Sequence, residues 1–255
     1  MIKPKILYNN VLRGLTPTWS GTTVAEAPPA NATDWRDFSL FTADTGNLDF
    51  TMSADAAIDA VSIFVATTAG SNSIVLQYES APSTFTTLKT YSTPSGTLTL
   101  DTFASVTVLS GRKIRFVVTA ATTMNIRQLV VGAAMETEMG QFTTMQYPTL
   151  LGGLKITNSI SANGSVIGRD IKQVERMGSL TLDYLTPTWV RATWEPFARH
   201  AARYAFIYQP NPTGYAYEVA FSTADSIDAP TNMGKGDRMA VSWKLRHIVA
   251  DQYGI

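Results

Sequence analysis

Histidine is the side chain best suited to proton transfer near neutral pH and to binding transition metals. The chain has only two, His200 and His247, and neither belongs to an HxxxH, HxH or HExxH pattern. There is no cysteine, which excludes a disulfide framework and a thiolate zinc site. We therefore interpret both histidines as surface or boundary residues rather than metal ligands or catalytic bases.

Nucleophilic serine chemistry also lacks its usual sequence context. A GxSxG elbow is absent, and the one SxxK pair, Ser110 with Lys113, lies in a turn that leads into a strand pattern. Paired carboxylates could support glycoside hydrolysis, but the Asp pairs lie in polar, turn-like segments, where Asp commonly caps or solvates the backbone. These pairs are Asp34 with Asp37, Asp44 with Asp49, and Asp225 with Asp228.

Cofactor and metal signals are equally weak. The segment Asp44–Asp49 offers oxygen ligands for calcium, yet it lacks the spacing and the glutamate of a helix-loop-helix calcium site. Neither Gly152-Gly153 nor Gly234-Lys235-Gly236 fits a phosphate-binding GxGxxG or GxxxxGK pattern. The sequence therefore predicts a non-enzymatic protein with no cofactor and no metal.

The charge balance argues against polyanionic partners. Lys plus Arg and Asp plus Glu both count 20, so no net positive field favours nucleic acid or an anionic membrane. Arg112-Lys113, Arg115 and Arg127 are better interpreted as a solvated sheet face than as a phosphate site. The longest apolar runs are far shorter than the roughly 20 residues that span a bilayer, and we expect a soluble chain without a signal peptide.

Residues 1–133 show the period-two alternation of half-buried strands. Two runs carry it, Ile74–Tyr78 and Ile114–Val118, and turn signals such as Thr93-Pro94-Ser95-Gly96 separate the runs. A last strand is expected over Ile126–Val131 and ends at Gly132. The alternation stops after it, so the domain boundary is expected after residue 133. The fold class expected is all-β with minor α, beginning with a jelly-roll sandwich over 1–133.

Residues 134–255 predict a second β-domain that carries one helix of about 187–203. Thr186 is a suitable N-cap, Pro187 suits the first helical position, and Pro196 predicts a kink or two short helices. Strand alternation precedes the helix and returns after it. The inward residues expected there are Leu180, Leu182 and Tyr184, then Phe206 and Tyr208, Tyr217, Val219 and Phe221, and finally Met239, Val241, Trp243 and Leu245.

The aromatic residues have no catalytic groups beside them and suggest contact roles. Two alternatives stay open for the helix: it covers its own sheet, or it faces a neighbouring subunit. The interface expected in the second case consists of Trp189, Arg191, Trp194, Phe197, Arg199 and Arg203. Trp19 and Trp35 either stack on a sugar or pack in the sandwich core.

The first half resembles the discoidin-like, carbohydrate-binding-module-like jelly rolls of phage tail proteins. The resemblance depends on a set of short segments spread over residues 1–133. These are Asn9–Leu12, Ile58–Ile63, Val75–Tyr78 with Phe85, Arg112–Phe116 and Ile126–Gly132. It implies a β-sandwich that could recognise a host surface glycan.

The second half resembles the distal tail or baseplate-hub adaptor proteins of long-tailed bacteriophages. The segments that carry this are Gly164–Arg169, Trp189–Arg191, Phe197 with Ala201–Arg203, Tyr217–Ala220, Asn232–Gly234, Asp237–Met239 and Val241–Trp243. The resemblance implies a ring-forming β-domain with a helix and a β-hairpin, here in the C-terminal half.

This resemblance implies a structural virion protein of the tail tip, made in the cytoplasm of the host bacterium. Its expected partners are further copies of itself in a ring, most simply a hexamer, and the tail tube, hub and fibres. The alternative is a carbohydrate-binding protein that recognises a host glycan through the N-terminal sandwich. A glycoside hydrolase is a third hypothesis, which requires two carboxylates in a cleft.

Overall fold

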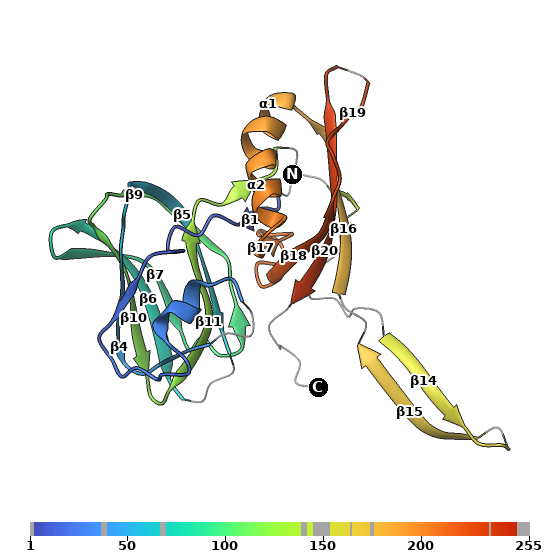
Figure 1. Cartoon of the computed structure of the whole chain (residues 1–255), viewed down its shortest axis with the longest axis horizontal. Coiled ribbons are helices and arrows are strands. Elements are labelled where there is room, and N and C mark those ends of the chain that lie inside the picture. The colour runs from blue at the N-terminus through green and yellow to red at the C-terminus, as the bar shows by residue number, and fades with distance from the viewer. Residues whose placement is uncertain are drawn as a thin grey trace.

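The computed structural model describes residues 3–36, 40–66, 70–138, 142–144, 154–163, 165–173, 176–234 and 236–248. The chain forms a β-sandwich, a second β-sheet with a helix packed on it, and a separate two-stranded arm (Figure 1). The expected all-β class with minor α is therefore confirmed.

The sandwich consists of two five-stranded antiparallel sheets. One has the order β2 (Pro17–Trp19), β4 (Gly46–Thr51), β10 (Lys113–Ala120), β6 (Asn72–Ala81) and β7 (Thr84–Ser92). The other has the order β3 (Phe41–Ala43), β11 (Met124–Gly132), β5 (Ala56–Val65) and β8 (Thr97–Leu98), with β9 (Asp101–Val108) also paired to β5. A short 3-10 helix, η1 (Pro29–Thr33), lies before β3.

The alternation in the sequence places the sandwich core correctly. In β6, Ile74 and Leu76 are fully buried, while Val75 and Gln77 are only partly buried. In β10, Ile114, Phe116 and Val118 are fully buried. Successive side chains of a strand point to opposite faces, so one face of each sheet fills the interior of the sandwich.

The second sheet has eight strands and includes the N-terminal strand of the chain. Its order is β12 (Met135–Glu136), β1 (Lys5–Leu7), β17 (Phe206–Gln209), β18 (Ala220–Ile227), β20 (Met239–Ile248), β16 (Arg176–Leu185) and β13 (Phe142–Thr144), with β19 (Thr231–Asn232) paired to β20. The sequence placed residues 5–7 in the first domain. The structure pairs them with β17 of the second, through Lys5 with Gln209 and Leu7 with Ile207.

The helical segment runs from Pro187 to Ala201 and changes its winding in the middle. It comprises α1 (Pro187–Trp189), a π-helical turn η2 (Val190–Trp194) and α2 (Glu195–Ala201). The Thr186 hydroxyl accepts a hydrogen bond from the Trp189 amide at 3.2 Å, as an N-cap should. Pro196 has no amide hydrogen to donate. The wider π-helical turn lies directly before it, and the Glu195 amide donates to the Val190 carbonyl at its end. The helix ends two residues before the expected Arg203.

Two inward positions expected in the second unit are wrong. Tyr184 is 62% exposed and has φ of +61°, because a bulge between Leu182 and Leu185 shifts the register and turns Leu185 inward. Tyr217 is 59% exposed, because it lies in the loop before β18 rather than in the strand. Period-two alternation carries no information about where a bulge interrupts it.

The two units share an apolar junction. In β17, Phe206 and Tyr208 pack under the helix, whereas Ile207 belongs to the cluster that faces the sandwich. Both faces of this strand are covered, which explains its continuous burial. The junction cluster consists of Leu7, Trp35, Ala60, Phe64, Leu98, Leu100, Val130, Ala205, Ile207, Val219 and Phe221.

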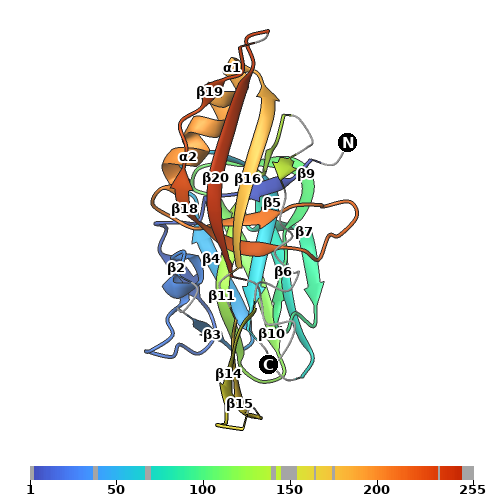
Figure 2. The same ribbon diagram turned by 90° about the vertical axis from the view of Figure 1, so that its right-hand side faces the viewer.

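A separate hairpin projects from the body. Its strands, β14 (Leu154–Ile160) and β15 (Val166–Gln173), pair with one another and form a sheet of their own. Figure 1 shows the hairpin pointing away from the sandwich and from the eight-stranded sheet, and in Figure 2 its tip extends below both.

Candidate functional site

The carboxylates considered for catalysis are engaged in structural contacts. Asp44 accepts hydrogen bonds from the Thr22 amide at 3.1 Å. Hydrogen bonding from the Thr22 side chain, and then from its backbone, lowers the pKa of Asp44. Asp34 accepts from Gln128 Nε2 at 3.2 Å and from the amide of Arg36. Asp225 pairs with Arg246, Asp228 accepts from the Ser242 hydroxyl, and Asp37 lies outside the described residues. The described carboxylates thus act as caps and ion-pair partners.

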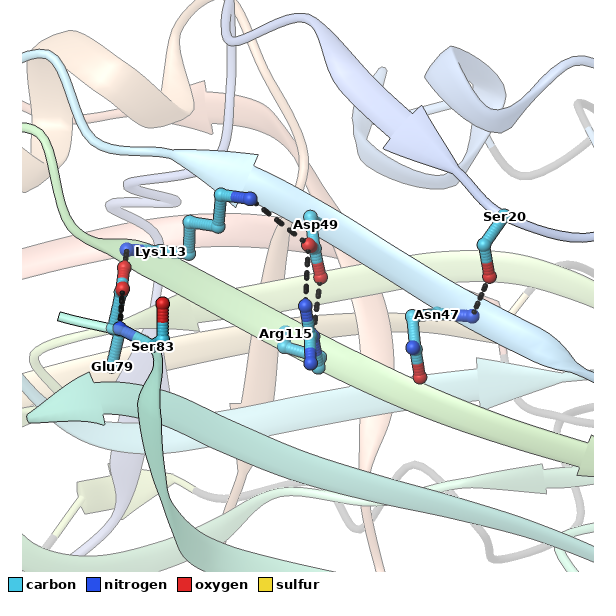
Figure 3. A network of polar contacts seen from close by, with 7 residues as sticks. All are labelled: Ser20, Asn47, Asp49, Glu79, Ser83, Lys113 and Arg115. Carbon is cyan, nitrogen blue, oxygen red and sulfur yellow. Dashed lines mark hydrogen bonds and ion pairs between the residues drawn. The ribbon is translucent and has the colours of Figure 1, made fainter.

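Asp49 is the centre of a polar network on the outer face of the sandwich sheet (Figure 3). Arg115 contacts its carboxylate through Nε at 2.7 Å and Nη2 at 2.8 Å, and Lys113 Nζ lies 3.4 Å away. Burial opposes ionisation of Asp49, but these two cations outweigh it together and lower its pKa. Lys113 and Arg115 therefore pair with Asp49 on one face of the sheet, and their charges are partly balanced within the protein.

The two histidines occupy different environments. His200 is partly buried, and its Nε2 lies 3.1 Å from the Ala205 carbonyl oxygen. His247 is 5% exposed, and its Nδ1 lies 2.9 Å from the Ser222 hydroxyl. The expectation of a surface or boundary position is therefore wrong for His247. Within the described ranges, no three His, Cys, Asp or Glu side chains come together as metal ligands.

The helix residues expected at an interface divide into two groups. Trp194 is 1% exposed and Phe197 is fully buried, and both contact Trp243 of β20. They form the core between the helix and its own sheet, which was the alternative left open. Trp189 is partly buried, and the exposed members are Arg191, Arg199 and Arg203.

Neither tryptophan considered for sugar stacking has a freely exposed ring. Trp35 is 6% exposed and packs at the junction against His200 and Phe221, so its ring is largely covered. Trp19 is partly buried with its edge on Phe41. A Cβ on Gly46 would lie only 2.9 Å from Cη2 of Trp19, so this glycine makes room for the ring.

The hairpin formed by β14 and β15, called the arm below, exposes two large apolar side chains. Ile160 is 62% exposed and Ile167 is 71% exposed, and both lie near the tip of the hairpin. The sequence contains a signal for this element that residue periodicity alone did not reveal: the dipeptide Asn163-Gly164 is a strong hairpin-turn signal.

A second candidate surface is a polar cleft of about 420 Å³ between β9 and the β17–β18 loop. Lys5, Asp101 and Gln209 line it, and Gln209 Nε2 donates to the Ala216 carbonyl at 2.9 Å. Ala216 also lines the cleft and lies between Tyr215 and Tyr217, which are 46% and 59% exposed. The polar lining of this cleft suits a carbohydrate or a polar peptide.

No protein-family model and no curated protein matches the sequence. Among solved structures, the chain is similar to CBM32-1 from a family 31 glycoside hydrolase of Clostridium perfringens, with 14% identity, 49% of this chain and 98% of that chain covered, and a TM-score of 0.41. It is also similar to chitosan-binding module 1 of a Paenibacillus sp. IK-5 chitosanase/glucanase, with 18% identity, 48% and 98% coverage and a TM-score of 0.40.

A third similar structure is CpGH89CBM32-5 from Clostridium perfringens, solved with GalNAc-beta-1,3-galactose. It shares 12% identity over 49% of this chain and 100% of that chain, with a TM-score of 0.41. Among the described helices of the present chain, none is long and apolar enough to cross a membrane.

Proposed function

We propose that this chain is a non-enzymatic assembly protein of a bacteriophage tail tip, in which several copies form a ring. The ring adapts the tail tube to the receptor-binding apparatus, and six copies is the expected number. The observation that carries the proposal is the hairpin arm formed by β14 and β15.

The arm is difficult to explain in an isolated monomer. A two-stranded hairpin in water is marginally stable at best, and its strands pair only with one another within the described chain. It spans seven register pairs and carries Ile160 and Ile167 exposed toward its tip. Docking on a neighbour would remove these side chains from water and stabilise the hairpin.

The body of the protein suits such an arrangement. The helix and the sandwich cover the two faces of β17, and the shared apolar junction fixes the sandwich against the second sheet. A rigid body with one projecting arm favours a heterologous contact, in which the arm of one copy meets a different surface of the next. Repetition of such a contact closes into a ring when its rotation divides a full turn.

The test is the mass of the particle formed by the full chain at increasing concentration. We expect a ring of defined stoichiometry by mass photometry and by negative-stain electron microscopy. A variant with Leu154–Gln173 replaced by a short Gly/Ser linker should stay folded and monomeric. A strict monomer of the full chain at high concentration, together with its absence from tail particles, would overturn the proposal.

Glycan recognition is the second candidate, and the polar cleft favours it. One lining residue, Ala216, lies in the chain between the exposed Tyr215 and Tyr217. A glycan array probed with the full chain tests it. Binding should fall when both tyrosines are replaced by alanine, whereas Tyr184→Ala, an exposed tyrosine on β16, serves as the matched control. Binding that is absent, or unchanged in the double variant, would exclude this cleft.

A further inference from the structure

A second cleft, of about 370 Å³, opens where the sandwich meets the end of the helix. It is lined by Trp35 and Arg36 from the segment after η1 and by Arg203 and Tyr204 from the turn after α2. The other lining residues are small: Ala201, Ala202, Ala205, Thr223 and Ala224. This volume lies at the lower end of the range for small-molecule sites.

Positive charge converges on this cleft from both units. The guanidinium of Arg13, from the sandwich, lies 3.5 Å from the ring centroid of Tyr204. A hydrogen bond from Arg13 and its charge, with a smaller contribution from Arg203, lower the pKa of the Tyr204 hydroxyl. Arg13 and Arg203 therefore both favour the ionised Tyr204 phenol, and Arg36 adds a third cation to the lining of the cleft.

The cleft has little negative charge to balance these arginines. None of the described residues that line it is acidic. The acidic residues next to it in sequence are engaged elsewhere, Asp34 with Gln128 and Asp225 with Arg246. The end of α2 contributes a partial negative charge of about half a unit, which is smaller than the charge of a single guanidinium.

The backbone of Trp35, which lines the cleft, is held in an unusual conformation. Its φ is +61°, in the left-handed region that a bulky side chain rarely adopts. Such conformations persist only where packing holds them, and they concentrate at ligand clamps and switch regions. Here the junction cluster holds Trp35 with its ring 5.7 Å from that of His200.

We propose that this cleft binds an anionic sugar unit, with Arg36 and Arg203 holding its carboxylate or phosphate group and the small lining residues packing against its ring. Guanidinium groups suit both oxyanions because they present a planar fork of donors. The volume of about 370 Å³ and the small lining residues favour one sugar unit over an extended peptide. The site is separate from the arm and goes beyond the assembly role.

Calorimetric titration of the full chain with D-glucuronate, glucose 6-phosphate and D-glucose tests the proposal. We expect at least one anionic sugar to bind and D-glucose to bind much more weakly. Which anion binds tells whether the oxyanion is a carboxylate or a phosphate. Arg203→Gln and Arg36→Gln should each weaken binding by about tenfold or more, because each removes one charge-assisted hydrogen bond to the oxyanion.

Arg199→Gln is the matched control. Arg199 lies on the same helical segment, is exposed, and contacts Glu195 at 3.4 Å outside the cleft, so its replacement should leave the affinity unchanged. Thermal melting of each variant verifies that the fold is retained. The proposal is overturned by equal affinity for glucose and the anions, by inorganic phosphate binding as tightly as the sugars, or by equal losses in Arg199→Gln and Arg203→Gln.

Discussion

The indole rings of Trp194 and Trp243 lie 4.6 Å apart at an angle of 48°, joining the helix to the middle of the eight-stranded sheet. Both side chains are 1% exposed, and Phe197 packs against both. Trp194, which was expected at a docking surface, therefore holds the second unit together. The exposed side chains of this region are instead those of Arg191 and Arg199 on the helix, and the arm exposes Ile160 and Ile167.

Replacing Trp194 by alanine should destabilise the second unit strongly. The change removes the contact with Trp243 and leaves a cavity, and such replacements cost about 3–5 kcal/mol. Chemical denaturation followed by tryptophan fluorescence measures the loss. Arg191→Ala, an exposed change on the same helix, should alter the free energy of unfolding by only about 0.5 kcal/mol.

Replacing Asp49 by asparagine should reduce stability at neutral pH by about 1–2 kcal/mol, because Arg115 loses its charged acceptor. The folded pKa of Asp49 is lowered, so its contribution is present above the unfolded pKa of about 3.9 and is lost as pH falls through the folded value. Denaturation curves between neutral and acidic pH test this. The difference between wild type and Asp49→Asn should shrink on acidification, and a constant difference would contradict the ion-pair explanation.

His200 should make the junction sensitive to mild acid. Burial lowers the pKa of His200, the Ala205 carbonyl partly counteracts it, and the nearby Arg13 charge lowers it further. The unfolded chain then binds the proton more readily, so stability is full above the unfolded pKa of about 6.5 and falls as pH drops through the folded value. In His200→Gln the loss of stability between pH 7.5 and pH 5.5 should be smaller than in the wild type.

Replacing Ile160 and Ile167 by asparagine should weaken assembly without unfolding the body. Both side chains are already more than half exposed, so the free energy of unfolding should change by only about 0.5 kcal/mol. Mass photometry should show a shift toward the monomer. Leu109→Asn, at a residue 50% exposed on the sandwich, is the control, and an equal shift in both variants would exclude a specific role of the arm.

Local patterns in the sequence were sufficient for much of the fold. Alternation placed Ile114, Phe116 and Val118 in the core, and Thr186 with Pro187 marked the start of the helix. These features depend on residues close together in the chain, where backbone geometry fixes which side chains share a face. The candidate sites were much less predictable. Trp35 was expected to stack on sugar or to pack in the sandwich core, and it lies at the junction instead.

The sequence by itself determined the all-β class, the sandwich, the single helix and the lack of catalytic patterns. Only the tertiary structure decided that β1 joins the second sheet, that Trp194 and Phe197 are core, and that Arg13 meets Tyr204 across the junction. Each of these contacts joins residues far apart in the chain. These contacts depend on the apolar surface buried and the charges paired over the whole chain. A local sequence pattern contains no information about them.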